Sequence, residues 1–140
     1  MAKRSFVLDT SAIIAFLENE DGAERVEYVL KNEDVIVCNV SLLEVFYIFH
    51  REQSRSVAEQ HYALLKSLPV SFVWTFDEPL ILTAGRFKAT TPLSIVDALI
   101  AACAYNSKAT LLHKDPEYQK LQGAILLETL PFKNPSDEQK

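Results

Sequence analysis

Glycine is scarce in this sequence, with only 3 copies among 140 residues. A glycine-rich loop that cradles phosphate groups needs several glycines close together, so a site of that kind is nearly excluded. Positive charge is also in the minority: 14 lysines and arginines stand against 19 aspartates and glutamates, for a formal net charge of −5. Indiscriminate binding of polyanions usually requires a basic surface, so we do not expect it, although these numbers permit a local basic rim around an acidic pocket.

Cysteine is rare as well. Cys38 and Cys103 lie in the apolar stretches DVIVCNV and LIAACAY, and no CxxC motif or Cys/His ligand spacing occurs. We therefore expect no zinc site. Two buried, reduced thiols are the simpler interpretation, and they favour a cytoplasmic protein. We find neither a signal peptide nor an apolar run long enough to cross a membrane, so we expect no membrane partner.

The remaining composition is that of a globular protein, with 49% apolar and 24% charged residues. The length suits one domain. We place this domain at residues 1–132 and expect a polar tail, KNPSDEQK, at residues 133–140.

Apolar runs of strand length alternate with helical patterns along this domain. Strands are expected at Ser5–Asp9, Val35–Val40, Val70–Phe76, Ala109–His113 and Ala124–Thr129, and helices at Thr10–Asn19, Gly22–Asn32, Ser41–Gln53, Ser56–Leu68, Asp77–Ala89, Leu93–Asn106 and Pro116–Gln122. Strands separated by helices imply right-handed crossovers and a parallel sheet, and strands that are apolar on both faces imply helices on both sides. We therefore predict an α/β fold, a three-layer αβα sandwich with a central parallel sheet of about five strands.

Acidic residues stand at the ends of predicted strands and the starts of predicted helices. Asp9 ends the first strand, Asp115 follows the fourth, and Glu44 and Asp97 lie in the first turn of helices. Each has an explanation in helix capping. Glu44 and Asp97 follow a serine at capping-box spacing, and Asp9 and Asp115 are suitable N-cap residues. Taken singly, capping explains each acid well.

Taken together, the same acids favour a functional site. Strand-to-helix junctions of a parallel sheet lie at its carboxyl edge, so folding should gather these side chains in one cleft. Two unpaired carboxylates about 4 Å apart repel by roughly 4 kcal/mol at an effective dielectric near 20, in a domain stable by only about 5–15 kcal/mol. Lys114 is the only basic residue next to one of the four. Glu44 and Asp97 also interrupt apolar helix faces, which is costly unless the charge is paired or coordinated.

The chemistry of the set points to a hard cation. Carboxylate oxygens without His or Cys select Mg²⁺ or Mn²⁺ over zinc or copper. A divalent ion would also offset the mutual repulsion of the acids. The sequence next to them supplies too few basic residues to do so.

Four sequence motifs carry a family resemblance. They are VLDTSAII around Asp9, SLLEVFYI around Glu44, LSIVDALIAACAY around Asp97 and TLLHKDPEY around Asp115. In order and spacing, from Asp9 to about Tyr118, the set resembles the PIN domain, the nuclease fold of VapC-type toxins. One motif alone is weakly specific, whereas four in register are strongly so.

The resemblance implies that four acids form a catalytic, metal-binding set: Asp9, Glu44, Asp97 and Asp115. Within this set, Glu44 is either a metal ligand or a general base. By the same match, three hydroxyl groups lie in or next to the coordination sphere of the metal, those of Thr10, Ser11 and Ser94.

Two positions depart from the family pattern. His113 stands where Ser or Thr is frequent, and Tyr118 stands where Phe is frequent. His113 either changes how a water or phosphate is oriented and weakens catalysis, or is a histidine at a strand end with no role.

The implied activity is that of a Mg²⁺- or Mn²⁺-dependent endoribonuclease, most simply the toxin of a VapBC toxin–antitoxin pair. The ion lowers the pKa of the attacking water and stabilises negative charge on the phosphodiester. The implied partners are RNA, a VapB-like antitoxin docked in an exposed helical groove, and a second copy of the chain in a homodimer. The crowded apolar side chains at Leu42–Phe49 agree with cover by a partner.

RNA contacts are expected from basic residues near the junctions or on helices that frame the cleft. Each is also explained as ordinary solvated surface: Arg51, Arg55, Arg86, Lys88 and Lys114.

Three alternatives stay open. A PIN nuclease that acts in RNA maturation without an antitoxin would lack a neighbouring short gene for a DNA-binding protein. A non-catalytic PIN-like module that binds RNA or protein is disfavoured by the complete acid set. A phosphoryl-transfer receiver or phosphatase with Asp9 as its nucleophile usually needs a second Asp nearby, and DTSAI supplies none.

Overall fold

β1 (Ser5–Leu8) is the central strand of a five-stranded sheet in the computed structural model, which describes residues 2–131. The strand order is β3-β2-β1-β4-β5, and all neighbouring pairs are parallel. The other strands are β2 (Asp34–Cys38), β3 (Ser71–Val73), β4 (Thr110–His113) and β5 (Leu126–Thr129).

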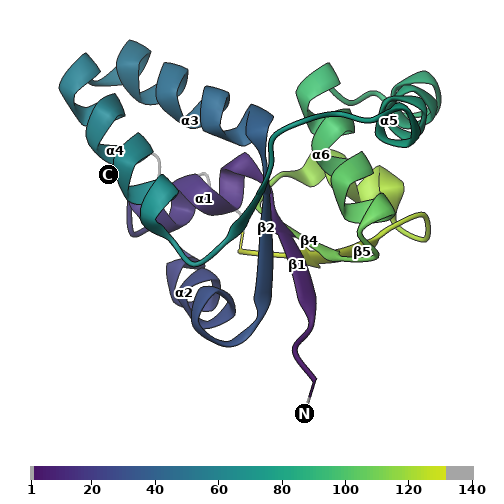
Figure 1. Ribbon diagram of the computed structural model, residues 1–140, viewed down its shortest axis with the longest axis horizontal. Helices are drawn as coiled ribbons and strands as arrows, with labels where there is room; N and C mark the ends of the chain where they lie inside the picture. The colour runs from purple at the N-terminus through teal and green to yellow at the C-terminus, as the bar shows by residue number, and fades with distance from the viewer. Residues whose placement is uncertain (1, 132–140) are drawn as a thin grey trace.

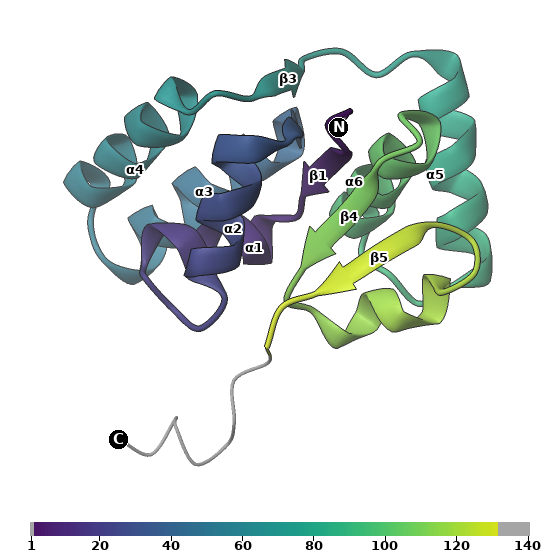
Figure 2. The same cartoon turned by 90° about the horizontal axis from the view of Figure 1, so that it is seen from below.

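Helices cover both faces of this sheet (Figures 1 and 2). One face is covered by α1 (Thr10–Leu17), α2 (Ala23–Asn32), α3 (Asn39–Glu52) and α4 (Arg55–Ser67). The other is covered by α5 (Glu78–Thr90), α6 (Ile95–Asn106) and the 3₁₀ helix η1 (Pro116–Leu121). The predicted αβα sandwich with a parallel sheet of five strands is confirmed. The domain limits stay a prediction, because the tail at 133–140 lies outside the described residues.

The central strand supplies side chains to two hydrophobic cores. Phe6 and Leu8 pack into the core beneath α1–α4, whereas Val7 packs into the core beneath α5 and α6. Successive side chains of a strand point to opposite faces, so a sheet covered on both sides needs an unbroken apolar run. This requirement explains why the sequence FVL carries no polar residue between its two layers.

α6 is buried on most of its sides, and most of its buried residues are small. Ala101, Ala102, Cys103 and Ala104 are each at most 1% exposed. Cys38, at the end of β2, belongs to the same core, and both cysteines are buried and free, as predicted. Among the helices described, none is both long and apolar enough to pass through a membrane.

Some element boundaries differ from the sequence prediction. α3 begins at Asn39 rather than Ser41, so Glu44 lies in its second turn, and Ser41 is a buried helical residue rather than a cap. The prediction of a first-turn Glu44 is therefore wrong, because the apolar run VIVCNV continues across the strand end without a turn signal. β3 covers only Ser71–Val73 of the expected strand, since it is an edge strand paired to β2 alone.

A crevice is expected where the chain leaves neighbouring strands toward opposite faces. β1 and β4 are adjacent; β1 leads into α1 on one face, and β4 leads into η1 on the other. Ligand sites of open parallel sheets gather at the carboxyl ends of strands at such a switch point. The acids at the ends of β1 and β4 therefore stand in the position that the topology favours for a site.

The burial of α6 predicts that a larger side chain at one of its buried positions is not tolerated. Ala101→Leu should lower the free energy of unfolding by about 1–3 kcal/mol, because the added methyl groups must displace strand side chains. Urea denaturation measures the change. Ala89→Leu, at an exposed position of α5, is the matched control and should shift it by less than about 0.5 kcal/mol. Equal effects at the two positions would contradict the close packing of α6.

Candidate active site

Asp9 lies at the centre of the carboxyl edge of the sheet. It directly follows β1, its backbone amide donates to the carbonyl of Leu112 on β4 at 3.0 Å, and its side chain is almost fully buried. The carboxylate caps α1: Oδ2 accepts from the Ser11 amide at 3.0 Å and from the Ser11 hydroxyl. Burial raises the pKa of Asp9, while the hydrogen bonds from Ser11 and Tyr118 act in the opposite direction. Asp9 thus caps α1 and is also a carboxylate whose charged form is disfavoured by burial.

Asp97 reaches the same place from the opposite face of the sheet. The Tyr118 hydroxyl lies 2.6 Å from Oδ1 of Asp9 and 3.0 Å from Oδ1 of Asp97, so one oxygen atom joins the two side chains. Ser94 caps α6 by accepting from the Asp97 amide at 3.0 Å. Burial, followed by the charge of Asp9, raises the pKa of Asp97 to about 6.

Glu44 is positioned by hydroxyl groups from α1 and α3. Thr10 Oγ1 donates to Glu44 Oε1 at 2.6 Å and lies 3.1 Å from Ser41 Oγ. Burial raises the pKa of Glu44, and the charges of Asp9 and Asp115 add to that effect. The buried hydroxyl groups of Thr10 and Ser41 therefore link α3, which carries Glu44, to the start of α1 at the end of β1.

Asp115 caps η1, with Oδ1 accepting from the Glu117 amide at 3.0 Å. Its own amide donates to Nδ1 of His113 at 3.1 Å, which assigns the ring proton to Nε2, facing Thr129 Oγ1 at 3.1 Å. His113 is fully buried, and burial lowers its pKa, so the ring is neutral and structural. His113 thus fixes the backbone at Asp115 rather than facing solvent at the site.

The four acids share one electrostatic neighbourhood. The charge of Asp115 contributes to the raised pKa of each of the other three, and Asp97 is influenced by all the others. Within residues 2–131, no lysine or arginine forms an ion pair with any of them. The expected convergence of negative charge without a fixed counter-charge is therefore present in the part of the chain that the structure describes.

The oxygen atoms of the acidic side chains decide whether the site can hold a divalent ion. No group of three or more His, Cys, Asp and Glu side chains in that part of the chain lies close enough to surround a metal ion as it stands. Mg²⁺, however, commonly binds proteins through one or two carboxylates, keeps several waters and takes further ligands from substrate phosphates. The Asp9–Asp97 pair supplies two carboxylates of this kind, so the donor set fits Mg²⁺ or Mn²⁺.

Three of the predicted RNA-binding residues are exposed arginines. Arg51 lies over the ring of Tyr47 at 5.3 Å and beside Glu52, and Arg55 pairs with Glu59. Arg86 donates to a threonine hydroxyl of its own helix.

The two predicted lysines hold chain segments instead of projecting freely. Lys88 donates to the carbonyl of Leu93 at 2.7 Å. Lys114 donates to the carbonyl of Asp21 at 2.9 Å, and its side chain is only 7% exposed. RNA contact through either lysine would have to share or break these bonds.

Sequence reasoning missed the groups that orient the acids through tertiary contacts. The sequence marks Tyr118 only as a departure from a frequent Phe, and it indicates a cap at Ser41, which is a helical residue. Tyr118 stands among polar residues, so its burial and its contacts with Asp9 and Asp97 have no signal in the sequence.

Fold and site together define an α/β domain with an acidic site at the carboxyl edge of its parallel sheet. The profile of the PIN domain family matches residues 6–124, and the chain therefore belongs to the PIN domain family. Members of this family are generally nucleases that use divalent metal ions. No curated protein matches the sequence.

Solved structures share the fold at low sequence identity. A chain of VapBC2 from Rickettsia felis, bound to a promoter DNA fragment, is 16% identical with a TM-score of 0.74, over 91% of this chain and 99% of that one. VapBC-1 from nontypeable Haemophilus influenzae is 21% identical with a TM-score of 0.70, over 89% of this chain and 97% of that one. VapBC-5 from Mycobacterium tuberculosis, a member of the VapBC family of toxin–antitoxin systems, is 20% identical with a TM-score of 0.63, over 89% of this chain and 96% of that one. At these identities the likeness shows the fold alone.

The raised pKa of Asp97 predicts how the stability of the metal-free protein depends on pH. Between its ordinary value of 3.8 and its folded value of about 6, Asp97 is protonated in the folded chain and ionised in the unfolded one. Stability contributed by this group is therefore lost as pH rises through that window. Asp97→Asn, whose amide oxygen can still accept from the Tyr118 hydroxyl, should raise the free energy of unfolding in EDTA at pH 7 by about 1–3 kcal/mol.

Chemical denaturation at several pH values measures this effect. The matched control is Asp34→Asn, at the exposed start of β2. A metal-free Asp97→Asn protein that is no more stable than the control at pH 7 would contradict the electrostatic description of the site.

Proposed function

We propose that this protein is a metal-dependent endoribonuclease that hydrolyses RNA phosphodiester bonds with Mg²⁺ or Mn²⁺, and that it is the toxin of a VapBC-type pair. The observation that carries the proposal is the contact of Asp9 and Asp97 with one hydroxyl oxygen at the switch point of the sheet. Membership of the PIN domain family supports nuclease chemistry there. Mutual repulsion of the acids supports a divalent ion as their partner.

Asp9 and Asp97 would hold the ion, with Asp115 and Glu44 completing the acid set. When bound, the ion supplies the lowered pKa of a water and positive charge against the phosphate. Ser11 and Thr10 orient Asp9 and Glu44 through direct hydrogen bonds, and Ser94 acts one step away by capping α6 at Asp97.

Glu44 is either an additional oxygen ligand or the base that accepts a proton from the attacking water. Its half-buried position and raised pKa suit a proton acceptor near neutral pH. Oε1 is held by Thr10, which directs the carboxylate and keeps it from turning freely into solvent. Both roles place Glu44 in the catalytic machinery.

A path for RNA away from the acids follows α3. Glu44, Tyr47 and Arg51 are spaced by three and four residues, so they lie on one face of the helix. Tyr47 is 41% exposed, and Arg51 covers its ring. Tyr47 lies about 4.5 Å and Arg51 about 10 Å along the helix axis from Glu44, and an aromatic ring beside a guanidinium group suits a nucleotide next to the scissile bond. Arg55 and Arg86 add exposed positive charge, and we keep Lys88 and Lys114 as weaker contributors.

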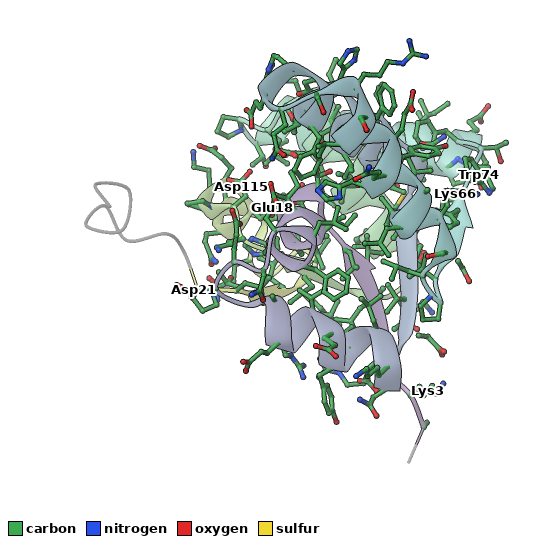
Figure 3. The ribbon with its side chains drawn as sticks, turned by 90° about the vertical axis from the view of Figure 1, so that its left-hand side faces the viewer. Lys3, Glu18, Asp21, Lys66, Trp74 and Asp115 are labelled. Carbon is green, nitrogen blue, oxygen red and sulfur yellow. The ribbon has the colours of Figure 1, made fainter. Side chains whose placement is uncertain are left out.

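A second aromatic and basic cluster lies at the edge of the sheet. Lys66 Nζ lies 4.4 Å from the centre of the Trp74 ring, and Figure 3 shows both on the side opposite Asp115. β3 is the edge strand and β2 lies between it and β1, so one strand separates this cluster from the strand that Asp9 follows. We assign it no part in the reaction.

We also propose a VapB-like antitoxin and a homodimer as partners. Exposed apolar side chains on α3, α5 and α6 support cover by other chains: Leu43, Ile81, Leu82 and Ile95 are each more than half exposed. The similar VapBC structures come from a family of toxin–antitoxin systems, which supports an antitoxin for this chain. A cytoplasmic location agrees with an RNA substrate.

The proposed activity predicts cleavage of single-stranded RNA by the purified chain with Mg²⁺ or Mn²⁺, and none with excess EDTA. Asp97→Asn should lower the cleavage rate by at least about 100-fold, because one of the two central carboxylates loses its charge. A gel assay with end-labelled RNA measures the rate, and circular dichroism checks the fold. Asp34→Asn should cleave at the wild-type rate.

Thermal melts test the metal part separately from the RNA part. Saturating Mn²⁺ should raise the melting temperature of the wild-type protein and of Asp34→Asn, but not that of Asp97→Asn. Wild-type cleavage by Asp97→Asn would contradict the site. Stabilisation by Mn²⁺ without any RNA cleavage would favour a binding module over a nuclease.

A further inference from the structure

We infer that Tyr118 is a positioning residue of the metal site: its hydroxyl holds the Asp9 and Asp97 carboxylates next to each other before an ion arrives. The inference rests on the proposed function, because it assumes that these carboxylates bind the ion. It concerns the hydroxyl of the last residue of the fourth motif, TLLHKDPEY, and not one of the acids.

The hydroxyl is fixed in place by the packing of its ring. Tyr118 is fully buried in the core beneath α5 and α6, and its ring lies edge-on to His113 at 5.1 Å. His113 is itself held at both ring nitrogens, by the Asp115 amide and Thr129 Oγ1. A buried ring between fixed neighbours has little freedom to turn, so the position of its oxygen is set by the fold rather than by the acids.

The two acids depend on this oxygen to different degrees. Asp9 has a second source of orientation, since Oδ2 accepts from the amide and hydroxyl of Ser11. For the Asp97 carboxylate, the Tyr118 hydroxyl is the only hydrogen-bond partner among the described residues. Asp97 is therefore the side chain whose direction is most sensitive to loss of the hydroxyl.

The hydroxyl also joins groups that would otherwise move apart. A phenol carries one proton, and both carboxylates lie where they can accept it, Asp9 Oδ1 at 2.6 Å and Asp97 Oδ1 at 3.0 Å from the phenol oxygen. Without this oxygen between them, two buried carboxylates lower their repulsion by turning away from each other. With it, both carboxylates stay next to each other, and an ion would meet two ligands that are already gathered.

A purely structural role predicts a different outcome from a positioning role. Phenylalanine fills the same space against His113 and lacks only the oxygen. If Tyr118 serves the core alone, Tyr118→Phe leaves metal affinity unchanged. If it positions the acids, the affinity falls even though the core stays filled, since groups that orient metal ligands typically contribute about 10- to 100-fold in affinity.

The experiment compares Mn²⁺ affinity in wild type, Tyr118→Phe and a control, measured by the paramagnetic resonance signal of free Mn²⁺ and without RNA. The control is Tyr105→Phe, which removes the hydroxyl of a half-exposed ring on α6, the helix that carries Asp97. We expect the dissociation constant of Tyr118→Phe to rise by about 10- to 100-fold and that of Tyr105→Phe to stay at the wild-type value. Urea denaturation in EDTA checks that both variants are folded.

A spectroscopic readout reports on the hydroxyl directly. Mn²⁺ binding to wild type should change the ultraviolet difference spectrum of tyrosine, because the ion alters the field at the phenol. Tyr105→Phe should keep this change and Tyr118→Phe should lose it. The wild-type and Tyr105→Phe spectra decide the matter even if Tyr118→Phe does not fold: no tyrosine change at saturating Mn²⁺ overturns the inference.

The outcomes separate this inference from the proposed function. Failure of the wild-type protein to bind Mn²⁺ contradicts the metal site itself, and the inference falls with it. Wild-type binding with equal affinity in Tyr118→Phe overturns only the role of Tyr118 and leaves the proposed nuclease intact.

Discussion

The repulsion between carboxylates at the carboxyl ends of β1 and β4 is the constraint on which the rest of the site depends. Asp9 is nearly fully buried, and Asp97 lies close enough to share a hydroxyl oxygen with it. Burial removes the solvent that would screen these charges, and the pKa of Asp97 rises to about 6 as a result. A fold keeps such an arrangement only where protons or a cation offset it, and the family to which the chain belongs generally uses divalent ions.

The fold creates this constraint through its topology. β1 and β4 are neighbours, but the chain leaves them toward opposite faces, so α1 and η1 lie on opposite sides of the sheet. Each acid is then held by the start of a helix or by a nearby hydroxyl: Asp9 and Asp115 as caps, Glu44 by Thr10. The same side chain can therefore both cap a helix and take part in the acidic cluster, so the two explanations do not compete. The Asp9 side chain caps α1 through Oδ2 and meets Tyr118 through Oδ1.

Much of the fold could be predicted from the sequence, because apolar strand-length runs and helical patterns alternate without ambiguity from Phe6 to Thr129. The gathering of acids could be predicted from the rule that parallel strands end at one edge. The start of α3 could not, since VIVCNV gives no turn signal between strand and helix. The contacts of Tyr118, Ser41 and Thr129 could not either, because each joins elements far apart in the chain. The hydrogen bond from the Lys114 ammonium group to the carbonyl of Asp21 could not be predicted for the same reason.

The proposed function requires that a divalent ion binds to the carboxylates of Asp9 and Asp97. Anomalous X-ray diffraction from crystals grown with saturating Mn²⁺ tests it most directly, because manganese scatters anomalously and protein oxygen does not. We predict the strongest anomalous peak within coordination distance of both carboxylates, at the end of β1. Well-ordered crystals with no peak there, or with manganese bound only at other acids, would contradict the account.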